Sequence, residues 1–81
     1  MIVPEQMKAA RGLIGWSQED LAEATSLGIA TVKRIEGSKE GIRGRAANLL
    51  LIEKTFEDAG VIFIPEDESG GPGVRLKKSS D

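Results

Sequence analysis

Two short helical segments separated by only three residues constrain the fold of this 81-residue sequence more than any other feature. Residues 18–25 and residues 29–36 each carry apolar side chains at helical spacing. The linker, residues 26–28, is too short for the second helix to run back along the first, so the two helices must cross steeply. A pair of helices joined in this way is a helix-turn-helix unit.

Local capping signals set the bounds of these two segments. Ser17 can accept a hydrogen bond from the backbone N–H of Asp20, and Asp20 stands where a capping box places an acid. Trp16 and Leu21 are spaced as a hydrophobic staple across this helix start, so we interpret the single tryptophan as structural. Gly37 ends the second segment.

Two further helices and a hairpin complete the predicted fold. A helix over residues 4–14 ends at Gly15, and a longer helix over residues 44–59 ends at Gly60. The apolar face of the longer helix is formed by Ala46, Leu49, Leu50, Ile52, Phe56 and Ala59. We therefore expect a mainly α domain of four helices.

The C-terminal part of the chain reads as β structure. Residues 61–64 are β-branched and aromatic, a loop rich in Gly and acids follows, and residues 74–77 alternate apolar and basic side chains. This pattern predicts a short β-hairpin. The expected organisation is a helical domain over residues 1–60 and a hairpin extension with a tail over residues 61–81.

Composition excludes several classes of function. The chain has no cysteine and no histidine, so a disulfide scaffold or a zinc finger is excluded and neutral-pH proton transfer lacks its usual side chain. We expect neither catalysis, nor a metal, nor a cofactor. No apolar run approaches membrane-span length and no secretory signal precedes the first helix, so we expect a cytoplasmic protein that does not contact a membrane.

The charge is distributed unevenly along the chain. The net charge is −2, but residues 31–45 carry five basic and two acidic side chains, whereas residues 46–70 carry one basic and six acidic ones. Such a chain can face a polyanion on one side and a different partner on the other. The alternative is that the segregated charges only form a solvated face.

The segments Ser17–Ala24 and Thr31–Glu36 read Ser-Gln-x-x-Leu-Ala, and Thr-Val followed by Arg-Ile-Glu. They resemble helix 2 and the recognition helix of the Cro/lambda-repressor-like (Xre) family of bacterial and phage transcriptional regulators. The resemblance covers roughly residues 7–59 and implies a lambda-repressor-like helix-turn-helix domain. Two positions depart from the family pattern: Ser26 stands where Gly is usual in the turn, and Gly28 stands where Ser or Thr usually caps the recognition helix.

The resemblance implies a DNA-binding role for a set of residues on these helices. The implied base contacts are Ile29, Ala30, Lys33 and Arg34, and Gln18 is the implied phosphate contact. Arg34 can donate two hydrogen bonds to guanine, while the apolar side chains can contact a thymine methyl. Two salt bridges are the alternatives: Arg34 with a residue of its own chain, and Lys33 with Glu36 three residues on.

The physical chemistry of other side chains adds phosphate contacts. Lys39 and Arg43 are expected to bind phosphates from the loop that follows the recognition helix. Thr31 could reach a phosphate or could pack within the chain. The predicted partner is therefore double-stranded DNA.

The predicted function is a sequence-specific transcriptional regulator, expected to act as a repressor, that binds a palindromic operator as a homodimer. We expect the hairpin to form the dimer contact, through Val61, Phe63, Val74 and Leu76. The alternative is that one face of the hairpin packs on the helix of residues 44–59 and that the other strand frays.

Two rival functions remain open at this point. One is an antitoxin whose acidic C-terminal half binds a toxin as a protein partner. The other is a protein-interaction module, for example an anti-activator, that does not bind DNA.

Overall fold

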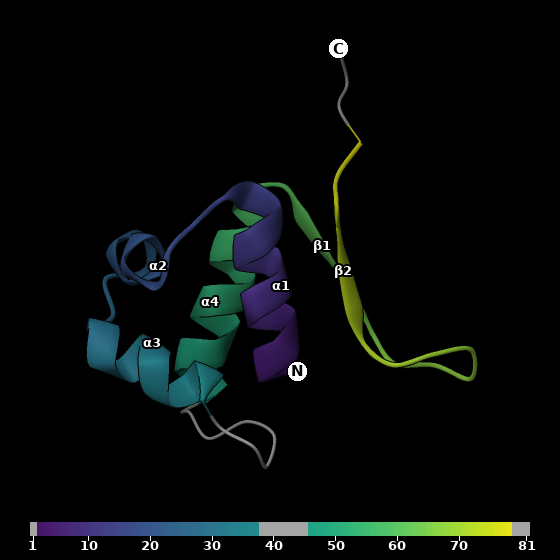
Figure 1. Ribbon diagram of the computed structural model, residues 1–81, viewed down its shortest axis with the longest axis horizontal. Coiled ribbons are helices and arrows are strands. Elements are labelled where there is room, and N and C mark those ends of the chain that lie inside the picture. The colour runs from purple at the N-terminus through teal and green to yellow at the C-terminus, as the bar shows by residue number, and fades with distance from the viewer. Residues whose placement is uncertain (1, 38–45, 79–81) are drawn as a thin grey trace.

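A computed structural model describes residues 2–37 and 46–78 of the chain. Within these residues, helices come first and a two-stranded antiparallel hairpin follows (Figure 1). The elements are α1 (Pro4–Ile14), α2 (Gln18–Thr25), α3 (Ile29–Glu36), α4 (Ala46–Asp58), β1 (Val61–Ile64) and β2 (Gly73–Leu76). The predicted mainly α architecture with a C-terminal hairpin is confirmed. Of the predicted helix over residues 44–59, the described part runs from Ala46 to Asp58.

The capping box predicted at the start of α2 is present. Ser17 Oγ accepts a hydrogen bond from the Asp20 N–H at 3.0 Å, and Asp20 Oδ2 accepts one from the Ser17 N–H at 2.9 Å. Each bond satisfies a backbone N–H that the first turn of a helix would otherwise leave unpaired. Local chemistry therefore determines where α2 begins.

The turn between α2 and α3 requires a left-handed residue, and Ser26 supplies it with φ 61°. This conformation is costly for a residue that has a Cβ atom. Gly28 has an ordinary extended conformation, with φ −67°, and caps α3 without a side-chain bond. The positive φ thus falls at the position of the turn where a glycine was expected, although a serine occupies it.

The core lies where α1, α2, α3, α4 and the start of β1 meet. Its fully buried apolar side chains include Met7, Leu21, Val32, Ile35, Leu49, Ile52 and Phe56. The Phe56 ring lies 5.8 Å from the Trp16 ring and 6.0 Å from the Phe63 ring, measured between centroids. Trp16 therefore packs against the core, as the structural interpretation of this residue predicts.

The hairpin packs back onto the helices, with β1 against α4 and β2 against α1. Its register pairs Val61 with Leu76 and Phe63 with Val74. Gln6, which is buried on α1, joins the two layers: its Nε2 donates to the carbonyl oxygens of Ile64 at 3.2 Å and Gly73 at 3.0 Å. None of the described helices is both long enough and apolar enough to span a bilayer.

Candidate nucleic-acid interface

Helix α3 has one buried face and one exposed face. Val32, Ile35 and Glu36 are buried, whereas Ala30, Lys33 and Arg34 are exposed, and Ile29 and Thr31 are half-buried. The alternation follows the helical period, because residues three or four apart lie on the same side of the helix. The four residues predicted to contact bases, Ile29, Ala30, Lys33 and Arg34, therefore all retain some access to solvent.

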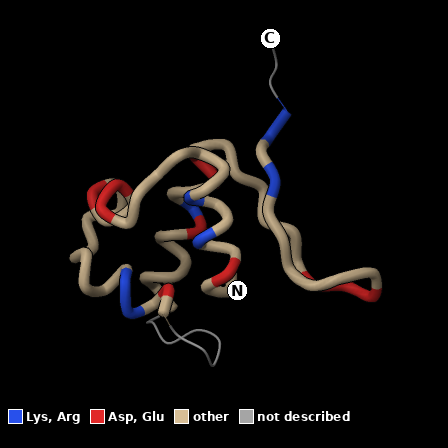
Figure 2. Tube along the Cα trace, in the orientation of Figure 1, with Lys and Arg blue, Asp and Glu red and all other residues tan. Residues whose placement is uncertain are grey.

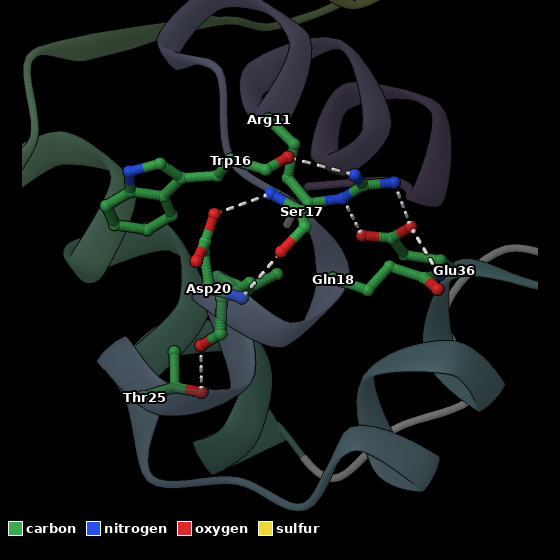
Figure 3. A network of polar contacts seen from close by, with 8 residues as sticks. Arg11, Trp16, Ser17, Gln18, Asp20, Thr25 and Glu36 are labelled. Atoms are coloured by element: carbon green, nitrogen blue, oxygen red, sulfur yellow. Dashed lines mark hydrogen bonds and ion pairs between the residues drawn. The ribbon is translucent and has the colours of Figure 1, made fainter.

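A buried carboxylate holds the C-terminal end of α3. Glu36 is only 2% exposed, and Arg11 Nε and Nη2 each donate to one of its oxygens at 2.8 Å (Figure 3). Gln18 Nε2 donates to the same carboxylate at 3.1 Å, and Arg11 Nη1 donates to the Trp16 carbonyl at 3.1 Å. This network, which we call the Glu36 network, joins α1, the start of α2 and the end of α3.

The Glu36 network is a fully paired buried charge. A bidentate arginine–carboxylate contact fixes direction as well as distance, because the guanidinium presents its N–H groups as a rigid fork. The hydrogen bonds to Glu36 raise the pKa of Arg11 above its ordinary value. Arg11 therefore keeps its positive charge, and the position of α3 does not depend on titration of Arg11.

The alternative salt bridge between Lys33 and Glu36 is absent. Both oxygens of the Glu36 carboxylate face Arg11 and Gln18 rather than the exposed side of α3. Ion pairs between described residues join Arg11 with Glu36 and Lys54 with Asp58. Lys33 and Arg34 are both exposed, and Figure 2 shows the blue basic segment along α3.

Gln18 lies at the first position of α2 and is half-buried. Its side-chain amide nitrogen gives one N–H to Glu36, and an amide nitrogen carries two. The bond to Glu36 holds the side chain in place and leaves a second N–H for another acceptor. The predicted phosphate contact by Gln18 is chemically compatible with this arrangement and stays a prediction.

The remaining predicted residues differ in their placement. Lys39 and Arg43 lie outside the described residues. Val61 is buried, and Phe63 and Val74 pack against the core of the same chain, whereas Leu76 is 48% exposed. Of the alternative, the packing of the hairpin on α4 is found, but β2 does not fray, because it pairs with β1 and packs against α1. Of the four residues predicted at a dimer contact, Leu76 alone presents a large exposed surface.

Sequence reasoning missed the Glu36 network. No partner for Arg11 was predicted, and Lys33 was considered as the partner of Glu36. Arg11 and Glu36 are 25 positions apart, so no helical or strand period relates them. A signal existed in principle, since Arg11 follows the helical spacing of Met7, which is buried. That spacing indicates that Arg11 lies at the rim of the core, but it does not indicate which residue Arg11 contacts there.

Comparison with known proteins gives no match, either to a model of a protein family or to a curated protein.

Proposed function

We propose that the chain is a sequence-specific DNA-binding transcriptional regulator that binds a palindromic operator as a homodimer, with α3 in the major groove. One observation carries the proposal: α3 is anchored on its inner face by the Glu36 network and presents Lys33 and Arg34 on its outer face. A helix that reads DNA must be held rigidly while its outward side chains remain available.

The arrangement of α2 and α3 supports the same proposal. The major groove is about 12 Å wide and admits one α-helix. In a helix-turn-helix protein the first helix of the pair crosses the DNA backbone while the second lies in the groove. We assign these roles to α2 and α3, within a lambda-repressor-like fold. The short turn between them, with its positive φ at Ser26, supports this assignment, because the family usually has a glycine at that position.

Each exposed side chain of α3 has a defined chemical use in the proposed complex. Arg34 donates two hydrogen bonds to O6 and N7 of a guanine, and Ala30 and Ile29 contact a thymine methyl group. Lys33 adds a second positive donor beside Arg34. Gln18 and Thr31 contact phosphates, as do Lys39 and Arg43, and these contacts set the position of the protein on the duplex. The expected outcome for transcription is repression.

Arg34→Ala tests the placement of α3. We expect affinity for the best operator to fall by roughly 1–3 kcal/mol, and the preference for guanine to relax at one position in each half-site. The operator comes from selection of bound sequences from random duplex DNA, and affinities come from titration at fixed salt. Lys54→Ala is the matched control, because it removes one positive charge from α4 and leaves α3 unchanged. An unaltered sequence preference in Arg34→Ala would show that α3 does not read the groove.

Salt dependence tests the electrostatic part of the proposal. Lys39 and Arg43 of two subunits would neutralise about four phosphates, whereas the uncharged Gln18 displaces no counterion, so the logarithm of affinity should fall against the logarithm of salt concentration with a slope of about −3.6. Fluorescence anisotropy of a labelled operator at several salt concentrations gives the slope. Binding that does not depend on salt, or no binding to any selected sequence, would refute the proposed function.

A further inference from the structure

The outer edge of β2 carries main-chain groups that the hairpin does not use. The Lys77 N–H donates to the Gly60 carbonyl at 2.7 Å, so Lys77 and Gly60 occupy a hydrogen-bonded position of the ladder. In an antiparallel ladder such pairs alternate with pairs whose N–H and C=O groups point away from each other. Val74 and Leu76 belong to the second kind. Among the described residues, no hydrogen bond reaches their outward groups from outside the hairpin.

Exposed apolar side chains lie along the same edge. Helix α1 packs against β2, and both run in the same direction in Figure 1, with Gln6 bonded to the Gly73 carbonyl at the start of the contact. The seven residues from Gln6 to Leu13 rise about 10 Å, as do the three from Gly73 to Leu76. Leu13, 41% exposed, is therefore level with Leu76. The open edge thus ends at the exposed Leu76, with Leu13 at a similar height on α1.

The two ends of the hairpin carry opposite charges. The end at the turn, called the acidic tip, contains Glu66, Asp67 and Glu68. The end of β2 and the residues just after it, called the basic end, contain Arg75, Lys77 and Lys78. Figure 2 shows the red segment at the turn and the blue segments toward the C-terminus. Along β2, negative charge is thus followed by positive charge.

Within the acidic tip, Asp67 keeps its negative charge at neutral pH. Asp67 Oδ1 accepts hydrogen bonds from Ser69, from the hydroxyl at 2.7 Å and from the N–H at 2.8 Å. These bonds lower the pKa of Asp67 below its ordinary value. Asp67 also exchanges main-chain hydrogen bonds with Gly70, which holds the tip as a narrow turn.

We propose that a second copy of this chain pairs with the open edge of β2, antiparallel and around a two-fold axis at Val74, to make a continuous four-stranded sheet. In this register the two Val74 residues exchange main-chain hydrogen bonds, and the N–H of each Leu76 donates to the carbonyl of Pro72 in the other copy. Arg75 lies opposite Gly73, so the two copies of Arg75 are diagonal neighbours and are not directly opposed. Leu13 and Leu76 lose exposed surface at both ends of the interface.

The antiparallel arrangement brings opposite charges together. Lys77 of each copy comes next to Gly71 of the other, and Lys78 next to Gly70, which is paired with Asp67. Neighbouring strands lie about 4.8 Å apart. Asp67 lies one strand beyond Gly70, so about 10 Å separates the main chain of each basic end from that of Asp67 in the other copy, a distance that the long lysine side chains shorten. Because the dimer is symmetric, the attraction between a basic end and an acidic tip occurs twice, once on each side of the two-fold axis.

The edge of β1 does not offer this complementarity. Acidic residues lie on both sides of it: Glu57 and Asp58 precede β1, and the acidic tip follows it. Two β1 edges in antiparallel contact would place negative ends against negative ends. Pro65, directly after β1, also lacks the N–H that would extend a ladder there. Edge pairing through β2 is favoured for these reasons.

This inference deepens the homodimer of the proposed function. The two-fold axis of an antiparallel strand pair is perpendicular to the sheet, and all described helices lie on one side of the hairpin (Figure 1). Both helical layers, and with them both copies of α3, would lie on the same side of the four-stranded sheet. That arrangement lets both recognition helices approach one face of a duplex.

Charge reversal tests the pairing, using the full chain without DNA. One variant carries Glu66→Lys and Glu68→Lys, and the other carries Arg75→Glu and Lys77→Glu. Each variant alone has like charges at both ends of the interface, and we expect its dimer dissociation constant to rise about 10- to 100-fold over that of the wild type. Mixed together, the two variants regain both attractive contacts. Native mass spectrometry, which separates the two masses, should then show mainly the heterodimer.

A main-chain variant tests the open edge independently. Leu76→Pro removes an N–H that points away from β1, so the hairpin keeps its own hydrogen bonds while the contact with the second copy is lost. Leu76→Val keeps the N–H and is the matched control. Circular dichroism checks that every variant is folded. A monomeric wild type, dimers of both charge variants as tight as the wild type, or a dimeric Leu76→Pro would each overturn the pairing. Because no DNA is present, none of these results bears on DNA binding by α3.

Discussion

Arg11→Met is expected to lower the free energy of unfolding by about 3–5 kcal/mol. The substitution removes the guanidinium and keeps an apolar stem, so the buried Glu36 carboxylate loses both short hydrogen bonds from Arg11. The remaining bond, from Gln18, is neutral and cannot balance the charge. Because small domains have total stabilities of about 5–15 kcal/mol, this loss is a large part of the whole. Urea denaturation followed by Trp16 fluorescence measures it.

Two controls separate the effect of burial from the loss of an ion pair. Arg11→Met combined with Glu36→Met replaces both charges by apolar groups and should recover most of the lost stability. Lys54→Met breaks the exposed pair with Asp58 on α4 and should cost less than about 1 kcal/mol. If Arg11→Met were no more damaging than Lys54→Met, the Glu36 network would not hold α3 in place.

Phe56→Ala is expected to cost about 3–5 kcal/mol of unfolding free energy. Phe56 is fully buried on α4, and its ring contacts the ring of Trp16 from the α1–α2 connection and that of Phe63 from β1. Truncation leaves a cavity between the helical layer and the hairpin, so both should loosen together. Thermal or urea denaturation gives the loss.

Leu50→Ala is the matched control for Phe56→Ala. Leu50 is an apolar residue of the same helix, but it is 60% exposed, so its truncation should change stability by no more than about 0.5 kcal/mol. Equal losses in the two variants would mean that α4 does not face the core through Phe56. The predicted apolar face of this helix included both Leu50 and Phe56, but only Phe56 is buried.

Much of the helical structure could be predicted because its signals are local. The bounds of α1, α2 and α3 were all obtained from the sequence. Ser17 and Asp20 form their capping box within one turn of helix, and Gly15 and Gly60, which end predicted helices, have the positive φ that glycine adopts most readily. Such interactions join residues three or four apart, so the sequence alone contains both partners in the correct order.

The candidate site was only partly predictable for the same reason. The exposed positions of Ala30, Lys33 and Arg34 follow from the helical period of α3 and the apolar character of Val32 and Ile35. The anchoring of α3 cannot be predicted from this period, because Arg11 and Glu36, which make the contact, are 25 positions apart in the sequence. Which basic side chain reaches a buried carboxylate depends on how α1, α2 and α3 cross. No periodicity in the sequence records that crossing.

The sequence by itself determined that this chain forms helices over residues 4–14, 18–25 and 29–36 and then a hairpin, because caps, glycines and apolar spacing act within a few residues. Only the tertiary structure decided that Glu36 binds Arg11 rather than Lys33, and that Val61, Phe63 and Val74 face their own core. The alternation of side chains along a strand defines the two faces of the hairpin, but it does not determine whether a helix of the same chain or a second chain covers each face. That choice depends on the space between α1 and α4, where burying the apolar face of the hairpin removes the most surface from water.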